Sequence, residues 1–250
     1  MILLSEWTKL RTIRSTVWAL VLTFVLSVGI SVLLAGYLNG SFDSFDAGYR
    51  DSFDPIEFAL GTIAYGQIVL VAFGVLAVSS EYGSGTIRSS LAAVPRRGQF
   101  FAAKIAVGTA AALVVSMITV FVMFFAAQAF LGSLGGSLGD PGALRAVFGT
   151  GLYLTLVAVF SMGAATILRS SGLSLGILIP FFFVVSNLVS RIPGIEAAGH
   201  YLPDQAGKQI MVVTGHTDSP LGPWQGLLVL AAWAAAAVLA GYVVLRHRDA

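Results

Sequence analysis

Long runs of apolar residues alternate with short polar segments along this chain. A bilayer core of about 30 Å requires roughly 20 helical residues, and six runs reach or approach that length. They lie at residues 17–38, 58–79, 101–131, 145–168, 172–190 and 224–245. The pattern predicts an all-α integral membrane protein with six transmembrane helices in a single membrane domain over 1–250. Pro180 predicts a kink in the fifth helix.

Composition supports a lipid environment. Of the 250 residues, 57% are hydrophobic and 10% are charged, whereas a soluble domain carries roughly 25% charged residues. The absence of cysteine excludes disulfides, thiolate metal sites and a cysteine nucleophile. The first apolar run follows Lys9, Arg11 and Arg14, as in a signal peptide. It is longer than the roughly 7–15 residues of a signal-peptide core, so we interpret it as an uncleaved span.

The basic residues predict the orientation of the spans. If the N-terminus is cytoplasmic, ten of the fourteen Lys and Arg residues fall on that side. They are Lys9, Arg11, Arg14, Arg88, Arg96, Arg97, Lys104, Arg169, Arg246 and Arg248. The positive-inside rule therefore predicts a protein of the cytoplasmic (inner) membrane with both termini in the cytoplasm. The lack of a charge near the middle of any span argues against a proton-coupled carrier.

The loop between the second and third runs carries the most information. Its glycines, Gly83 and Gly85, allow a sharp chain reversal. Ser84 or Thr86 can cap a short helix that Pro95 would end. One face of that helix is apolar, with Ile87, Leu91 and Val94 at helical spacing. The loop therefore predicts a short cytoplasmic helix beside basic residues; the alternative is an ordinary basic loop.

The N-terminal segment, residues 1–16, also has a helical pattern. Leu3, Leu4, Trp7 and Leu10 share one side, and Lys9 and Arg11 lie on the other. This pattern is typical of an amphipathic helix in the membrane interface, where Trp7 suits headgroup depth. The alternative is a simple basic flank of the first span.

The last polar segment, residues 191–222, is predicted to be an extracellular loop with short helices between about 195 and 210. It contains four possible metal ligands, His200, Asp204, His216 and Asp218, but their spacing matches no ligand motif. No metal site is therefore predicted. The Gly172/Gly176 pair, which opens the fifth run, could allow close helix packing.

Two segments resemble one membrane-protein family. The string from Glu81 to Lys104 has an acidic residue, a Gly-x-Gly-Thr-Ile-Arg-like turn, Pro-Arg-Arg and a later Ala-Lys. It resembles the first cytoplasmic loop of ABC type-2 permeases, the six-helix membrane subunits of ATP-binding cassette exporters. The segment Ser5–Ser15 resembles that family's entrance helix, and length, span number and loop layout agree over the whole chain.

The resemblance implies roles for both segments. Residues 83–94 would be a coupling helix that sits in a cleft of a separate ATPase. The implied coupling residues are Glu81, Gly83, Gly85, Thr86, Ile87, Arg88, Leu91, Pro95, Arg96 and Arg97. The N-terminal segment would be a connecting helix beside it, with Trp7, Lys9, Arg11 and Arg14 as its site residues. Glu81 would pair with a basic residue of that helix such as Arg11 or Arg14, and residues 191–222 would hold a re-entrant helical segment.

The resemblance also implies the partners. The phosphate-loop motif is missing, since Gly98–Ile105 lacks the second glycine and the Ser or Thr after Lys104. The chain would therefore not be an enzyme and would bind no cofactor. A separate ATPase subunit, present in two copies, would bind ATP and Mg²⁺. The permease would pair with a second copy or a paralogue in membrane lipid, without a nucleic-acid partner.

In the resembled family the second and fifth spans line the cargo path. The implied lining residues are Tyr65, Gln67, Phe73, Phe181, Phe182, Phe183 and Asn187. Aromatic lining suits an amphipathic or hydrophobic cargo, with a drug or antibiotic as the family-level expectation and lipid or peptide export as alternatives. A different class of function, a membrane anchor or regulator of an ATPase in envelope signalling or remodelling, also fits the sequence.

Overall fold

Long apolar helices dominate the computed structural model, which describes residues 2–83, 97–192, 194, 196–214 and 219–247. Within these residues six helical segments are long and apolar enough to cross a membrane, which confirms the predicted all-α fold with six spans. They are α2 (Arg14–Ser41), α4 with α5 (Pro55–Gly61 and Ile63–Gly83), α7 (Arg97–Leu131), α8 (Ala143–Leu168), α9 with η3 and α10 (Ser171–Pro180, Phe181–Val185 and Ser186–Val189), and α13 (Pro223–His247). The chain is a multi-pass membrane protein.

The remaining helices of the described residues are short; α1 precedes the first span, and the others lie in the connections between spans. They are α1 (Ile2–Thr12), η1 (Phe42–Ser44), α3 (Ala47–Ser52), η2 (Gly132–Leu134), α11 (Glu196–Gly199), α12 (Pro203–Lys208) and η4 (Gln209–Met211). Acidic residues cap two helices of the first connection. The carboxylate of Asp46 accepts from Tyr49 N at the start of α3, and that of Asp54 accepts from Glu57 N at the start of α4.

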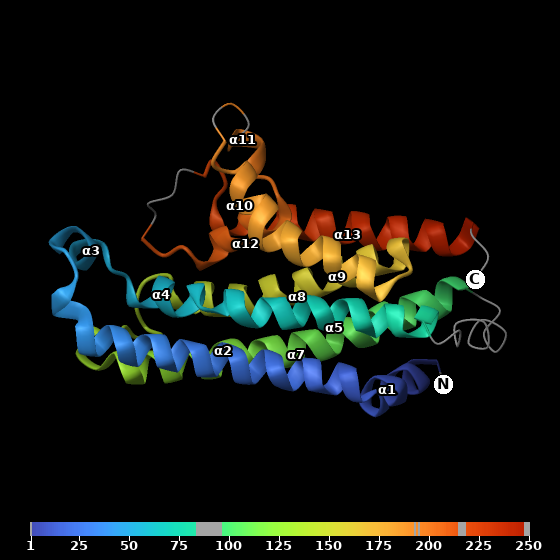
Figure 1. Ribbon diagram of the computed structural model, residues 1–250, viewed down its shortest axis with the longest axis horizontal. Coiled ribbons are helices and arrows are strands. Elements are labelled where there is room, and N and C mark those ends of the chain that lie inside the picture. Colours follow the sequence, from blue (N-terminus) through green and yellow to red (C-terminus); the bar gives the residue numbers. More distant parts are fainter. Residues whose placement is uncertain (1, 84–96, 193, 195, 215–218, 248–250) are drawn as a thin grey trace.

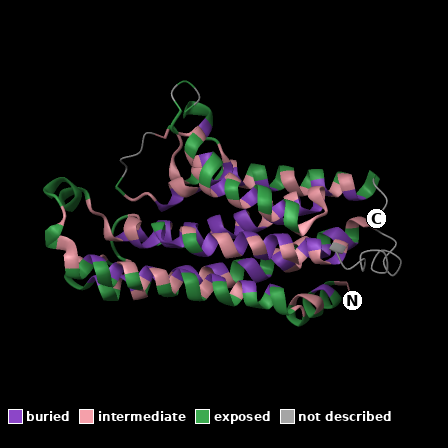
Figure 2. Cartoon of the chain, viewed as in Figure 1, coloured by how far each residue is buried: buried purple, intermediate pink, exposed green. Residues whose placement is uncertain are grey.

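The spans lie side by side around a centre formed by α5 and α8. Figure 1 shows the start of α1 and the end of α13 at the same end of the bundle. In Figure 2 buried positions concentrate on α5 and α8, whereas α2 and α13 expose much of their surface. Phe73 of α5 and Tyr153 of α8 are among the largest fully buried side chains. An apolar outer surface is expected for helices that face lipid.

Close helix contact occurs at Gly163 of α8. A Cβ atom built there would lie 2.6 Å from the carbonyl carbon of Ala237 on α13, so only glycine allows this approach. The predicted Gly172/Gly176 pair behaves differently, because a Cβ at either position would meet nothing of the described chain within 4 Å. Within this chain the pair therefore makes no close helix contact.

The fifth span changes helix type near its middle, at Pro180, where the sequence predicts a kink. Pro180 ends α9, and the next five residues, Phe181–Val185, form a π-helical turn before α10. Proline removes a backbone donor and crowds the preceding turn, which favours such a local change of helix type. Figure 1 shows α10, α11 and α12 at the edge of the bundle opposite α2.

Candidate functional site

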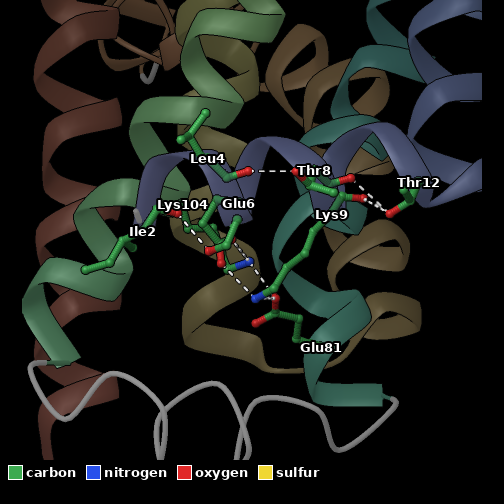
Figure 3. Close-up of polar contacts among 9 residues, drawn as sticks. Ile2, Leu4, Glu6, Thr8, Lys9, Thr12, Glu81 and Lys104 are labelled. Atoms are coloured by element: carbon green, nitrogen blue, oxygen red, sulfur yellow. Dashed lines mark hydrogen bonds and ion pairs between the residues drawn. The ribbon is translucent and has the colours of Figure 1, made fainter.

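A turn between α1 and α2 places the N-terminal helix against the end of the bundle. Ile13 has an extended backbone with φ −77° and ψ 104°, which breaks the helix between Thr12 and Arg14. Because of this break, α1 leaves the axis of α2 and packs against α7. It thereby brings its Glu6 and Lys9 side chains towards the ends of α5 and α7 (Figure 3).

Four charged side chains from three helices meet there in an ion cluster, which consists of Glu6, Lys9, Glu81 and Lys104. Nζ of Lys9 lies 2.7 Å from Oε1 of Glu6 and 2.9 Å from Oε1 of Glu81. Nζ of Lys104 lies 2.7 Å from Oε2 of Glu6 and 2.9 Å from Oε1 of Glu81. Each carboxylate thus contacts both ammonium groups, and the ion cluster is electrically neutral.

Burial makes this pairing obligatory. Glu6, Glu81 and Lys104 are only 4%, 5% and 8% exposed, respectively. A buried charge without a partner is costly, so each of these three residues requires a counter-charge. The Phe100 ring covers both cations, with the two Nζ atoms of Lys9 and Lys104 at 5.4 and 5.2 Å from its centroid. Such placement over an aromatic face adds cation–π attraction.

One oxygen of the ion cluster is not engaged. Oε2 of Glu81 is buried and has no hydrogen-bond partner among the described residues. A cavity of about 20 Å³ beside the cluster is lined by Glu81 and by Thr16, whose buried hydroxyl also has no partner among those residues. That volume can hold about one water molecule. Glu81 therefore has capacity for one more hydrogen-bond donor.

The ion cluster changes the proton affinity of its members on α1. Burial raises the pKa of the Glu6 carboxyl, but the Lys104 ammonium, and then Lys9, outweigh burial and hold that pKa below its ordinary value. Burial lowers the pKa of Lys9, but hydrogen bonds to Glu6 and Glu81 outweigh burial and raise it. Both residues are therefore more firmly charged than they would be in water.

The start of α7 is also attached to the end of α13. The Arg97 guanidinium donates to the carbonyl of Leu245 at 3.2 Å. Arg169, which directly follows α8, donates to the carbonyl of Val244 at 3.2 Å. The rings of Phe101 and Tyr242 stack nearby, with centroids 6.2 Å apart. Basic side chains at the last carbonyls of a helix complement its dipole. This end of α7 is therefore held by α1, α5 and α13.

The comparison with known families identifies the chain. The sequence profile described as "ABC-2 family transporter protein" matches residues 2–187, well over half of the chain. The chain belongs to the ABC-2 family of transporter proteins. This confirms the resemblance noted in the two sequence motifs. No curated protein matches the chain. Members of the ABC-2 family form the membrane part of transporters, so the family implies a partner ATP-binding subunit.

Most of the predicted coupling residues of this ABC-2 protein lie outside the described residues. They are Gly85, Thr86, Ile87, Arg88, Leu91, Pro95 and Arg96. Glu81 and Gly83 form the end of α5, and Arg97 begins α7. The structure therefore describes both flanks of the predicted coupling helix, residues 83–94, and the ion cluster joins those flanks through α1.

Glu81 does pair with a basic residue of the N-terminal helix, as expected, but that residue is Lys9 and not one of the two arginines named. Instead of Arg11 or Arg14, Glu81 contacts Lys9 and Lys104. Arg11 lies over the Trp7 ring, 5.9 Å from its centroid, so these two side chains share one side of α1 and are not on opposite sides as predicted. Arg14 is exposed. The reason is the turn at Ile13, which points the Lys9 side of α1 inwards and leaves Leu3, Leu4 and Trp7 exposed.

Sequence reasoning assigned no role to Glu6, Phe100 or Lys104. Glu6 and Lys104 do lie within the two strings that carry the family resemblance. A further signal was available, because Glu6 and Lys9 are three residues apart and so share a helix face. An acidic residue and a lysine at this spacing indicate an ion pair along one face of the helix.

The predicted cargo-path residues divide into two groups. Gln67, Phe73 and Phe182 are buried inside the chain, and Gln67 accepts a hydrogen bond from Tyr153 Oη at 2.8 Å. Tyr65 is 48% exposed. Half-buried positions are held by Phe181, Phe183 and Asn187. Only Tyr65 and these half-buried side chains present surface outside the folded chain, so a path between two subunits would involve them first.

A second buried carboxylate lies at the other end of the bundle. Asp204 of α12 is fully buried and accepts hydrogen bonds from the Ser186 hydroxyl, from Gln205 Nε2 at 2.9 Å and from Lys208 Nζ at 3.2 Å. Gln205 also donates to Asn187 Oδ1 at 3.0 Å. These bonds attach the end of the fifth span to α12.

Glu57 and Arg145 hold the segment that follows α12. Oε1 of Glu57 accepts from the backbone N–H groups of Val213 and Thr214 at 2.6 and 2.8 Å. Arg145 donates to the carbonyl of Val212 at 2.8 Å. Among the residues that the structure describes, no group of three His, Asp or Glu side chains could hold a metal ion. Of the possible ligands considered in the sequence, His216 and Asp218 lie outside those residues.

Proposed function

We propose that this chain is the permease subunit of an exporter that moves an amphipathic or hydrophobic cargo, with a drug-like or antibiotic-like molecule as the first candidate. Two copies, or one copy and a paralogue, would assemble with two ATPase subunits that bind ATP and Mg²⁺. Both termini and residues 83–94 would lie on the cytoplasmic side of the cytoplasmic membrane, as the distribution of basic residues favours. Residues 191–222 would then be extracellular, with α11 and α12 as the re-entrant segment.

The ion cluster carries this proposal. It ties the connecting helix α1 to Glu81 and Lys104, which flank the proposed coupling helix on α5 and α7. Because separating buried opposite charges costs several kcal/mol, α1 and these two helix ends would move as one body. When ATP closes the ATPase pair, a push on residues 83–94 would therefore reach α5 and α7 together.

The cargo would pass between two permease copies along α5 and the α9–α10 region, which pack against each other within the chain. Tyr65 supplies exposed aromatic surface on α5, and Phe181, Phe183 and Asn187 supply half-buried surface on the fifth span. An Ala substitution at Tyr65 is expected to change transport without changing ATPase binding. Phe125→Ala, at a similarly exposed phenylalanine on α7, is the matched control and should leave transport unchanged.

Co-purification with the ATPase tests the coupling assignment. The double substitution Arg88→Glu with Arg96→Glu should release the ATPase. Arg50→Glu with Arg191→Glu reverses two charges at the opposite end of the bundle and should leave the complex intact. Glu81→Gln should retain the ATPase but lose cargo-dependent ATP hydrolysis in reconstituted vesicles, because the push would no longer be transmitted.

The outcomes separate the possible functions. A complex that survives the Arg88 and Arg96 changes would remove the coupling-helix placement. ATP hydrolysis that responds to no cargo, in an intact wild-type complex, would favour the anchor or regulator of an ATPase over the exporter.

A further inference from the structure

An apolar groove runs along the outside of the bundle between α1, α2 and α7. Its volume is about 520 Å³, within the roughly 300–1,000 Å³ of typical ligand pockets. Its walls include Val17 and Val21 of α2 and Ala110 and Val114 of α7, all of them exposed. Both helices are membrane spans, so the groove opens towards the hydrocarbon of the bilayer.

The end of the groove at α1 has a different chemistry. Trp7 and Arg11 line it there, with the guanidinium over the indole ring. Among the described residues, neither Arg11 nor the nearby Arg14 forms an ion pair. The two carboxylates that the structure describes at this end of the bundle, Glu6 and Glu81, are already neutralised by Lys9 and Lys104. The groove is therefore apolar along its length and carries at one end a cation, Arg11, that has no carboxylate partner within the described part of the chain.

We infer that this groove binds an anionic phospholipid from the leaflet around α1. An acyl chain would lie between α2 and α7, and the phosphate would lie against Arg11, with Trp7 at headgroup depth. Basic pockets between membrane helices at the cytoplasmic face are suited to anionic headgroups. The lipid would brace α1 from outside, while the ion cluster holds the same helix from inside.

Charge distinguishes this occupant from a second copy of the chain. A helix of another subunit could cover the apolar walls, but it would leave Arg11 without an anion. In a two-fold interface formed by this groove, each copy would bring its own Arg11 towards the contact, and like charges would repel. An anionic amphiphile satisfies both the walls and the cation.

Lipid retention by the purified full-length chain tests the inference. The protein in mild detergent is titrated with phosphatidylglycerol or phosphatidylcholine of identical acyl chains, and bound lipid is counted by native mass spectrometry. Wild type should retain phosphatidylglycerol preferentially. Arg11→Gln should reduce that preference about fivefold, and Arg11→Lys should keep most of it. Ala110→Phe, which fills the groove, should reduce retention of both lipids.

Two matched variants serve as controls. Arg14→Gln removes an exposed cation that does not line the groove, and Ala129→Phe adds the same bulk at an exposed position elsewhere on α7. Both should retain lipid as wild type does. Equal loss in Arg14→Gln and Arg11→Gln would show diffuse surface charge and overturn the site. Unchanged lipid retention in Ala110→Phe would also overturn the site. If that variant, with its lipid retention intact, no longer associated with a second copy, the groove would be a contact between subunits instead. The assay contains no ATPase, so its result is independent of the proposed transport function.

Discussion

Glu81 at the end of α5 and Lys104 near the start of α7 meet in a buried ion pair, with Oε1 and Nζ 2.9 Å apart. The pair joins the two ends of the segment between these residues. Residues 84–96 of that segment contain most of the predicted coupling helix. Glu6 and Lys9 complete the pair from α1. At the end of the bundle that would receive an ATPase, ion pairs therefore hold α1, α5 and α7 together in addition to apolar packing.

Glu81→Gln should destabilise the folded chain. It leaves Lys9 and Lys104 to share Glu6, so the buried cluster acquires a net positive charge. Breaking a buried pair costs about 3–5 kcal/mol, so we expect the free energy of unfolding to fall by about 3 kcal/mol. Thermal or steric-trap unfolding in detergent measures this change.

A second substitution should restore part of that loss. In Glu81→Gln with Lys104→Met, the cluster reduces to the neutral pair of Glu6 and Lys9. In the wild-type structure Oε1 of Glu6 and Nζ of Lys9 are 2.7 Å apart. The double variant should lose clearly less stability than the sum of the two single variants. Strict additivity would show that Glu81 and Lys104 do not act as a pair.

The stability of the ion cluster should depend on pH at both extremes. The folded-state pKa of Glu6 is below its ordinary value of 4.5, so its contribution is present above pH 4.5 and disappears as pH falls through the lower folded value. The folded-state pKa of Lys9 is above 10.5, so its contribution is present below pH 10.5 and disappears as pH rises further. The melting temperature of wild type minus that of Glu6→Gln should therefore be constant near neutrality and shrink below about pH 4.5.

Glu196→Gln provides the control for this pH series, because Glu196 is an exposed acid. Its melting temperature should follow that of wild type at every pH. A difference between wild type and Glu6→Gln that stays the same from pH 7 to pH 3 would contradict the assignment.

Asp204→Asn should loosen the opposite end of the bundle. The substitution keeps the shape of the side chain but removes the charge that Ser186, Gln205 and Lys208 stabilise. Hydrogen bonds to a charged group contribute about 1.5–3 kcal/mol, so we expect a loss of about 2 kcal/mol in the free energy of unfolding. Asp43→Asn, at a fully exposed carboxylate, should cost almost nothing. Equal effects at both positions would show that burial of Asp204 has no energetic role.

Gly163→Ala should separate α8 from α13. The added methyl group would meet the Ala237–Val238 backbone at 2.6 Å, and such overpacking costs about 1–3 kcal/mol. Gly176→Ala is the matched control, since nothing of the described chain lies within 4 Å of its Cβ. That variant should be neutral or up to about 1 kcal/mol more stable, because alanine is the better helix former. Wild-type stability of Gly163→Ala would contradict the close contact.

The spans were predictable because their signal is local. The length and apolar character of a run such as 145–168 are sufficient to predict a membrane helix, and α8 covers Ala143–Leu168. A local irregularity at Pro180 was predictable for the same reason, since proline disturbs the helix that contains it, but the π-helical form of that irregularity was not. The short helix α3 was missed in the sequence, although Asp46 is a favourable cap for it.

The ion cluster was not predictable in detail because it depends on how three helices are rotated about their axes. The backbone angle of Ile13 decides that Lys9, rather than Arg11, faces Glu81. Nothing in the residues around Ile13 specifies this angle. Lys104 lies in a segment that resembles the ordinary start of a membrane span. Its role in the cluster depends on Glu6, which lies 98 residues earlier.

The alternating contacts of the ion cluster have a consequence for sequence variation among relatives. Since each carboxylate contacts both ammonium groups, each of the positions 6, 9, 81 and 104 has two partners of opposite charge. A charge lost at one position can be compensated at either of two others. These four positions should therefore covary as a set that preserves zero total charge, with the individual residues free to exchange roles.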